Sequence, residues 1–595
     1  MELMRIDGYA RIEDYALIGD GRTSALVALD GSVDWLCLPN LDSPSVFAAL
    51  LDRERGGTFE LQPVDAFEAA RRYLPDTNVL ETTFTTSTGV VRVVDALTLP
   101  GHGLEPMREL ARSIEGVSGR VNMRWRFAPR FDYGRLVPRW ERRGGMIIAG
   151  CEGESIALSA WNAGTVVATE GDRRGTFELA AGERALLAMS TAYAEPLIAA
   201  PRRDVEARLG HTIAFWKRWT DERHYEGPWK EAVRRSALVL KMLIFAASGA
   251  SVAAPTTSLP ESIGGTRNWD YRFCWIRDSN FLIDALLDLG CYDEARSLFW
   301  WFMHATALTE PALHVLYRLD GGTRATEREL PLSGYRQSRP ARVGNGAVDQ
   351  LQLDIYGALF ETAWLYSKGH HSLDHDTGVV LARVANRVCD IWRCPDSGIW
   401  EVRNGPFHFT HSKAMCWGAL HRAVRLAEQG ELPARHVDRW RKESAAILDF
   451  IDTRCWSESR RSYTRVAGDE TLDASLLMLP TIRFPSHERV RATVDAISRG
   501  LRHDDFVYRY RVDDGVPGNE GCFLNCSFWL VSALARTGRV DQAASMMDRL
   551  VARANDVGLY SEEVEPANGT FLGNFPQALV HLALIEAAIA VGKRS

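Results

Sequence analysis

The chain has 595 residues, of which 46% are hydrophobic and 25% charged, and its formal net charge is −7. A chain of this size and composition can bury a large core in two or three domains, which excludes an intrinsically disordered protein. The acidic balance argues against a nucleic-acid partner, because phosphate binding needs a basic surface. No apolar run approaches the roughly 20 residues that cross a bilayer, and the first residues lack the apolar core of a secretion signal. We therefore expect no membrane association and a cytoplasmic location.

The first third of the chain predicts short β-strands separated by Gly, Asp and Ser turns. The clearest hairpin lies within residues 23–39, where two apolar runs flank Asp30 and Gly31. Further runs with strand character follow at 79–86, 90–97, 146–149, 155–159 and 165–168. Several short strands of this kind are typical of a β-sandwich. We expect a β-sandwich domain over 1–204 and a helical linker over 205–228.

From residue 229 onward the spacing of apolar residues becomes helical, as in the stripe formed by Leu579, Leu582 and Ile585. Twelve helices are predicted, near 229–248, 277–289, 292–306, 347–368, 374–393, 410–428, 434–453, 471–480, 486–500, 521–537, 540–555 and 574–591. Six helical hairpins would close into an (α/α)6 barrel over 229–595. The fold class would then be mainly α with an N-terminal β domain. A helical solenoid is the alternative, but its repeats would be more regular.

The predicted connections between helices alternate in length, which places all the long ones at one end of the barrel. The long segments are 249–276, 307–346, 394–409, 454–470, 501–520 and 556–573. Loops held on a rigid scaffold often carry functional residues. We therefore expect the functional site at the end where these loops gather.

The composition of these loops predicts a carbohydrate site. The chain has 18 tryptophans and 16 tyrosines, and the segments 261–278, 398–404 and 558–569 combine carboxylates with aromatic or bulky apolar side chains. Flat rings suit the C–H faces of a sugar, and charged side chains suit its hydroxyl groups. None of the ten cysteines forms a C-x-x-C pair, so the sequence indicates neither a zinc site nor a disulfide framework.

Cleavage of a glycosidic bond needs one carboxyl group that donates a proton and another that is ionised. Glu401 follows Trp400, whose indole can desolvate the carboxyl and raise its pKa, as a general acid requires. Glu562 and Glu563 lie in a separate loop, and one of them is the predicted base. The two catalytic carboxyls would come from distant parts of the chain and face a common cavity.

Several separated motifs resemble those of glycoside hydrolase family 15, the group of glucoamylases, glucodextranases and bacterial trehalases. Residues 269–272 (Trp-Asp-Tyr-Arg) and 275–278 (Trp-Ile-Arg-Asp) are similar to its substrate-clamp motif. Residues 399–402 (Ile-Trp-Glu-Val) resemble its general-acid motif, and 560–563 (Tyr-Ser-Glu-Glu) its general-base segment. The runs 15–24 and 30–35 are typical of its bacterial members. The resemblance covers almost the whole chain.

The resemblance implies a β-sandwich joined by a helical linker to an (α/α)6 barrel, and inversion at the anomeric carbon without metal or cofactor. Glu401 matches the acid and Glu562 the base. Arg277 and Asp278 match residues that hold the hydroxyls of the terminal glucose. In fungal members the base is followed by Gln, where this chain has Glu563, so Glu563 stays an alternative base.

Four further residues are predicted to contact the sugar. Trp269, Trp275 and Trp400 would offer aromatic faces, although packing of the barrel rim also explains Trp269 and Trp400. Glu520 is a candidate third carboxylate at the same rim. Its alternative role is that of an acidic residue in a first helical turn, where it favours the helix dipole.

Together these features predict an exo-acting, inverting α-glucoside hydrolase that releases β-glucose, with carboxyls roughly 6.5–9.5 Å apart. Trehalose is the first expected substrate, which would make the enzyme a trehalase. Malto- or isomalto-oligosaccharides are the second, as for a glucoamylase or glucodextranase. The same residues are also compatible with a phosphorolytic enzyme or with a catalytically inactive sugar-binding protein.

Overall fold

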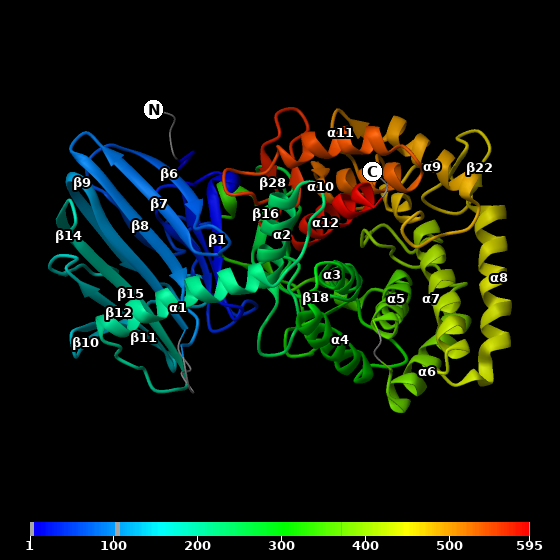
Figure 1. The fold of residues 1–595 in the computed structure, drawn as a ribbon, viewed down its shortest axis with the longest axis horizontal. Coiled ribbons are helices and arrows are strands. Elements are labelled where there is room, and N and C mark those ends of the chain that lie inside the picture. Colours follow the sequence, from blue (N-terminus) through cyan, green and yellow to red (C-terminus); the bar gives the residue numbers. More distant parts are fainter. Residues whose placement is uncertain (1–4, 102–107, 370–371, 594–595) are drawn as a thin grey trace.

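The computed structural model describes residues 5–101, 108–369 and 372–593. A β-sheet domain and a helical domain lie next to each other along the long axis of the molecule (Figure 1). Helix α1 (Arg202–Asp221) runs between them (Figure 1). Among the residues described, none of the helices has the length and apolar character that a membrane span requires.

The β domain consists of two antiparallel sheets that share the 21-residue strand β9 (Arg108–Ala128). Its first half pairs with β8 (Gly89–Leu97) and β15 (Arg184–Tyr193), and its second half with β5 (Thr58–Pro63) and β14 (Arg173–Ala180). The other strands are β1 (Tyr15–Gly19), β2 (Ser24–Ala28), β3 (Val33–Cys37), β4 (Ser45–Phe47), β6 (Phe67–Tyr73), β7 (Leu80–Thr86), β10 (Arg139–Arg143), β11 (Met146–Cys151), β12 (Glu154–Trp161) and β13 (Val167–Ala168).

The faces of the two sheets enclose one core. Arg112 of β9 forms a buried ion pair with Asp95 across the ladder, with 2.8 Å between Nε and Oδ1, and it also donates to the carbonyls of Phe59 and Gly31 on the other sheet. The predicted hairpin is present, since β2 and β3 pair around Gly31. The predicted β-sandwich is confirmed.

The helical domain is a double ring. The inner elements pack in a closed circle of α3 (Ile276–Asp288), α5 (Asp354–Lys368), α7 (Thr410–Glu428), the 3-10 segment η5 (Ala474–Met478), α10 (Leu524–Arg536) and α12 (Ala578–Gly592), which returns to α3. The outer elements are α2 (Lys230–Leu243), α4 (Tyr292–Ala307), α6 (His375–Ile391), α8 (Val437–Arg454), α9 (His487–Gly500) and α11 (Val540–Val551). The (α/α)6 barrel is confirmed.

Eleven of the twelve predicted helices are α-helices in the described structure, and the one predicted at 471–480 is not. It contains only η5. Asp473, just before it, has extended backbone, and Pro480, two residues after its end, has no N–H with which to donate a helical hydrogen bond. The predicted starts at 347 and 521 are too early. A 3-10 segment (Gly346–Asp349) precedes α5, and strand β26 (Cys522–Phe523) precedes α10.

Every long connection runs from an outer helix to the N-terminus of the next inner element. The N-terminal ends of the inner ring therefore meet the long loops at one end of the barrel. The first of these loops forms strands β16 (Thr257–Pro260), β17 (Asn268–Asp270) and β18 (Cys274–Trp275) before α3 begins. Helix N-termini carry partial positive charge, so this end of the ring favours carboxylates and hydroxyl oxygens.

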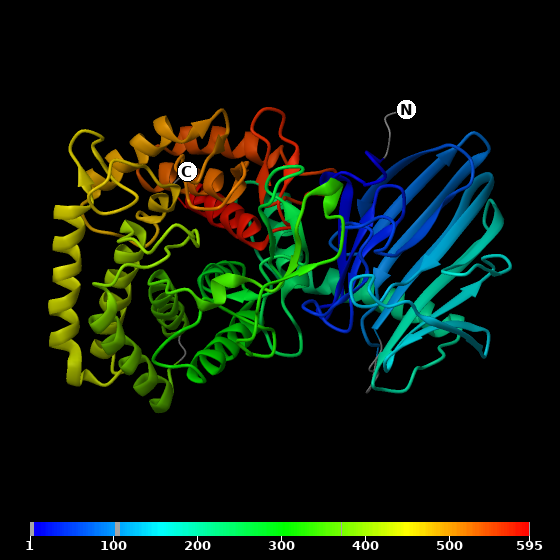
Figure 2. The ribbon, with the colours of Figure 1, turned by 180° about the vertical axis from the view of Figure 1, so that it is seen from behind.

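The β domain is docked onto these same loops. Arg272, which follows β17, is 2% exposed and donates to the Ser43 carbonyl and the Tyr133 hydroxyl of the β domain, each at 2.8 Å. Its guanidinium also pairs with the buried Asp270 carboxylate at 2.8 Å. A second contact comes from the segment around Ser333, whose backbone N–H donates to Asp52 at 3.0 Å (Figure 2). Arg272 thus belongs to the domain interface, not to the sugar clamp.

Replacing Arg272 by Met should destabilise the protein by about 3–5 kcal/mol, because it leaves the Asp270 carboxylate buried without its partner. Activity should fall as well, since Trp269 and Tyr271, which line the cavity, are neighbours of Arg272 in the same loop. Thermal unfolding and kcat/KM measure the two effects. Arg120→Met is the matched control, because the Arg120–Glu178 pair is exposed on the β domain and should contribute less than about 1 kcal/mol. Equal losses in the two variants would contradict the docking role of Arg272.

Candidate active site

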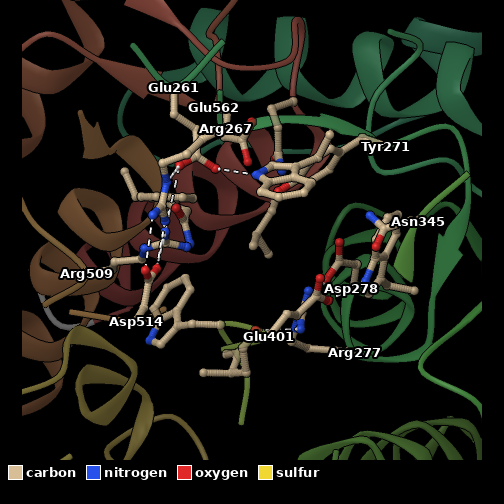
Figure 3. A pocket seen from close by; sticks show the side chains of 18 of the residues that line it. Glu261, Arg267, Tyr271, Arg277, Asp278, Asn345, Glu401, Arg509, Asp514 and Glu562 are labelled. Carbon is tan, nitrogen blue, oxygen red and sulfur yellow. Dashed lines mark hydrogen bonds and ion pairs between the residues drawn. The ribbon is translucent and has the colours of Figure 1, made fainter. Parts of the chain in front are cut away.

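A cavity lies at the loop end of the barrel (Figure 3). It is lined by seven of the nine residues predicted from the sequence, namely Trp269, Trp275, Arg277, Asp278, Trp400, Glu401 and Glu562. Glu401 and Glu562 approach it from opposite sides (Figure 3). Glu520 and Glu563 are not among its lining residues. Segments far apart in the chain therefore meet at one site.

Glu401 sits in a tight turn between α6 and α7. Its φ is 59°, a left-handed conformation that is strained for a glutamate. Oε1 accepts a hydrogen bond from the Trp275 indole at 2.8 Å. Burial raises the pKa of Glu401, and the nearby Arg277 guanidinium only partly opposes this effect. The environment therefore favours a carboxyl group that carries a proton.

Glu562 lies across the cavity, in the long loop that follows α11. Its Oε2 accepts a hydrogen bond from the Asn574 backbone N–H at 3.0 Å. Oε1 is buried and has no hydrogen-bond partner among the described residues. Burial and the negative charge of Glu261 raise the pKa of Glu562 to about 7. One oxygen is thus held in place, and the other is free to bind a water molecule.

Glu563 points away from the cavity, because neighbouring residues on an extended strand face opposite sides. It begins strand β27 (Glu563–Val564), which pairs with β26 and with β28 (Phe571–Leu572). Its Oε2 accepts a hydrogen bond from the Gly521 N–H at 2.6 Å. Burial and the carboxylates of Glu261 and Glu520 raise the pKa of Glu563 well above its ordinary value.

Arg277 and Asp278 occupy the first turn of α3 and are tied to the loop of Glu401. Arg277 donates from Nε to Asp278 at 3.0 Å and from Nη1 to the Ile399 carbonyl at 3.0 Å. Burial raises the pKa of Asp278, and Arg277 counteracts the rise. Side by side at the cavity wall, a guanidinium and a carboxylate offer donors and acceptors to adjacent sugar hydroxyls.

The three predicted tryptophans take different positions around the cavity. Trp275 stacks on Tyr271 with 5.4 Å between ring centroids. Trp269 lies beside the guanidinium groups of Arg342 and Arg403, at 4.8 and 4.5 Å from its ring centroid. Trp400 donates its indole N–H to Asp473 at 2.8 Å, which fixes the ring next to Glu401.

A buried network of charges beside Glu562 was not predicted from the sequence. Arg267 and Arg509 hold three carboxylates from two long loops, those of Glu261, Asp514 and Glu520. Figure 3 shows the two arginines with Glu261 and Asp514. Arg267 lies 2.7 Å from Asp514 and 2.9 Å from Glu520. Glu520 is therefore an ion-pair partner behind the cavity wall. Glu261 lines the cavity and accepts the Trp269 indole N–H at 2.9 Å.

The one sequence signal for this network is that its residues lie in two of the predicted long loops. Glu261 and Arg267 lie in the first long loop and Arg509, Asp514 and Glu520 in the fifth, but pairing between two loops cannot be read from either one. In the part of the chain that the structure describes, no group of three or more His, Cys, Asp and Glu side chains is arranged to hold a metal ion. The polar groups in the cavity are instead carboxylates, which accept hydrogen bonds, and guanidinium and indole N–H groups, which donate them. This combination suits a neutral polyhydroxy ligand.

Comparison with known proteins places this geometry in a family. Residues 227–589 match the family model for glycosyl hydrolases family 15, and residues 5–177 match the trehalase-like N-terminal model. The chain belongs to glycosyl hydrolase family 15. The resemblance predicted from the sequence is confirmed, and this family 15 protein is a glycoside hydrolase.

Relatives of this family 15 hydrolase align along nearly its whole length. A trehalase of Mycobacterium tuberculosis is 41% identical, over 98% of this chain and 89% of its own. A trehalase of Thermoplasma volcanium is 34% identical, over 98% of this chain and 94% of its own. The crystal structure of a bacterial glucoamylase complexed with acarbose superimposes with a TM-score of 0.74 at 13% identity, covering 99% of this chain and 94% of the other. That similarity shows a shared fold.

Replacing Glu261 by Gln should move the acidic limb of the pH profile of kcat/KM to lower pH. The cavity must hold one ionised carboxylate for hydrolysis, and Glu562, with a pKa of about 7, loses its charge as the pH falls. Removing the charge of Glu261 lowers the pKa of Glu562, by about one unit. Glu327→Gln is the control, because Glu327 pairs with Arg342 and Arg403 at the rim. An unmoved limb in Glu261→Gln would show that Glu261 does not tune the base.

Proposed function

We propose that this family 15 hydrolase cleaves trehalose by single displacement, with inversion at the anomeric carbon. The observation that carries the proposal is the placement of Glu401 and Glu562 on opposite sides of one cavity. Trp529 and Leu579 line the inner end of this cavity, which supports attack on a terminal sugar. The curated relatives named trehalase, aligned over 98% of the chain, favour trehalose among the α-glucosides.

In the proposed reaction, one glucose of the substrate binds at the inner end of the cavity. Arg277 and Asp278 hold its hydroxyl groups. Glu401 donates its proton to the glycosidic oxygen as the bond from that oxygen to the anomeric carbon breaks. A water molecule bound to the free Oε1 of Glu562 attacks the anomeric carbon from the opposite face, and Glu562 accepts the water proton. One glucose leaves as the β anomer, and the proton on Glu562 returns through solvent to Glu401.

Glu562 is the proposed base, ahead of Glu563. Each glutamate has one buried carboxyl oxygen without a partner among the described residues, but only Glu562 lines the cavity, whereas Glu563 accepts the Gly521 N–H with its other oxygen. Burial also raises the pKa of Glu563 well above its ordinary value, which disfavours the ionised form that a base needs. In this proposal Glu563 supports strand β27, and its neighbour carries out the chemistry.

Proton NMR of freshly formed product should show β-glucose before mutarotation, with trehalose hydrolysed faster than maltose or isomaltose. Inversion follows from a water molecule that attacks from the face opposite the leaving oxygen, which needs carboxyls roughly 6.5–9.5 Å apart. Initial α-glucose would contradict the single displacement. Faster cleavage of maltose or isomaltose would assign the enzyme to an oligosaccharide instead, and release of glucose 1-phosphate only with phosphate would indicate phosphorolysis.

Glu401→Gln and Glu562→Gln should each lower kcat by about 10²–10⁴-fold, because each removes one partner of the proton transfer. Both variants should still bind trehalose, which distinguishes lost catalysis from lost folding. Glu563→Gln is the matched control and should retain most of the activity, because Glu563 does not line the cavity and Gln has nearly the same shape. A severe loss of kcat in Glu563→Gln with normal activity in Glu562→Gln would reverse the assignment. Unchanged hydrolysis in Glu401→Gln would exclude Glu401 as the acid.

A further inference from the structure

A second cavity, of about 530 Å³, lies inside the barrel at the end opposite the long loops. Side chains from all six inner elements or the turns that follow them line it. Trp529 and Leu579 line both this cavity and the active site, so they form a shared floor. A volume of this size falls within the range of roughly 300–1,000 Å³ typical of small-molecule sites. We refer to it as the rear cavity.

Most charged groups of the rear cavity are already paired. Glu361 binds Arg422, with 3.0 Å between Oε1 and Nη2. Glu586 accepts hydrogen bonds from Thr481 and Ser532, at 2.8 and 2.9 Å, and lies 3.3 Å from Arg536. At the outer edge, Asp288 pairs with Lys593 at 3.3 Å. These carboxylates need no further partner.

Two acceptors on α3 have no partner. Asn280 is 8% exposed, and its buried Oδ1 has no hydrogen bond within the described part of the chain. Asp284 lies one helical turn further along the same face, and no hydrogen bond or ion pair of its carboxylate is found among the described residues. Burial and the carboxylates of Asp288 and Glu586 raise the pKa of Asp284 to about 7. Both side chains line the rear cavity. An unpaired buried acceptor is costly, and a ligand with hydroxyl donors removes that cost.

Aromatic rings form the wall next to these acceptors. Phe281 lies 6.3 Å from Trp529, measured between ring centroids. Trp364 is held by the guanidinium groups of Arg422 and Arg425, each 5.2 Å from its ring centroid. The cavity thus combines flat apolar faces with acceptors that point inward, the combination that suits the C–H faces and hydroxyls of a sugar.

The charges around the cavity disfavour an ionic ligand. Arg422, Arg536 and Lys593 oppose a cation, and the carboxylates of Glu361 and Glu586 oppose an anion.

We propose that the rear cavity is a second sugar site, which binds glucose through Asn280 and Asp284 against the rings of Phe281 and Trp364. The choice of glucose rests on the proposed function, which makes glucose the product. Trp529 links the two cavities, because its ring also packs against Trp400, 6.0 Å away between centroids.

Equilibrium dialysis with radiolabelled glucose tests the site and needs no turnover. The double variant Asn280→Leu, Asp284→Leu should bind one glucose fewer per chain than the wild type, while its initial rate of hydrolysis stays the same. Leu has the same branched arrangement of heavy atoms as Asn and Asp, so the substitutions keep the side-chain shape while removing the polar atoms. Folding raises the pKa of Asp284 from 3.8 to about 7, so the Asp284 carboxyl destabilises the fold increasingly as the pH rises between these values. Asp284→Leu removes this destabilisation.

Asp293→Leu, at the exposed start of α4, is the matched control and should bind as much glucose as the wild type. Ala583→Trp fills the rear cavity from α12 and should cause the same loss as the double variant, which keeps the test valid if that variant does not fold. Equal stoichiometry in wild type, double variant and Ala583→Trp would overturn the proposal. The proposal would also be overturned if the wild type bound tetramethylammonium and not glucose, and if the double variant no longer bound tetramethylammonium. Failure of the proposed function would appear separately, as missing trehalose hydrolysis.

Discussion

The loop end of the barrel depends on the pairing of two buried guanidinium groups with the buried carboxylates of Glu261 and Asp514 and the half-buried carboxylate of Glu520. Arg267 and Arg509 bring together loops that are more than 200 residues apart in the chain, since each contacts Glu261 and Glu520. Burying charges costs several kcal/mol each unless they are paired and hydrogen-bonded, so neither loop can keep this position without the other. The network also places a negative charge beside Glu562, which links the architecture of the loops to the protonation of the proposed base.

The polarity of the inner helices explains why the two ends of the barrel differ. At the loop end, helix N-termini with partial positive charge face the catalytic carboxyls and their sugar contacts. At the other end, basic side chains such as Lys368, Arg536 and Lys593 lie near helix C-termini, where the dipole favours them. The floor of Trp529 and Leu579 separates these environments, and each half of the barrel interior has its own chemistry.

Much of this architecture could be predicted from the sequence, because the decisive signals are local. Strand and helix periods, the Asp30–Gly31 turn and the alternation of short and long connections all lie within short windows. The exceptions have physical causes. The helix predicted at 471–480 is limited by Pro480, and β9 was not predicted because Gly116 and Gly119 interrupt its strand pattern. Glu401 could be placed at the cavity because the motif at 399–402 lies within one short window.

The relations between distant loops could not be predicted. Glu562 and Glu563 look equivalent in sequence, and only the direction of β27 distinguishes the residue that faces the cavity. Glu520 has the sequence context of a sugar contact, but its carboxylate is held by Arg267 and Arg509. Arg272 lies in the middle of a substrate-clamp motif and yet points into the other domain. In each case the role of the side chain depends on which distant segment of the chain lies opposite it. That arrangement is set only when the ring of helices closes.

The position of Arg272 has a consequence for how proteins of this architecture can be divided or recombined. The loop that bears it also presents Trp269 and Tyr271 to the cavity, so this loop is anchored partly in the β domain. A barrel expressed as an isolated fragment would expose the anchor of its own catalytic loop to solvent. A barrel fused to a foreign N-terminal module would keep its helices and lose the shape of its pocket, unless that module supplied acceptors where Ser43 and Tyr133 stand.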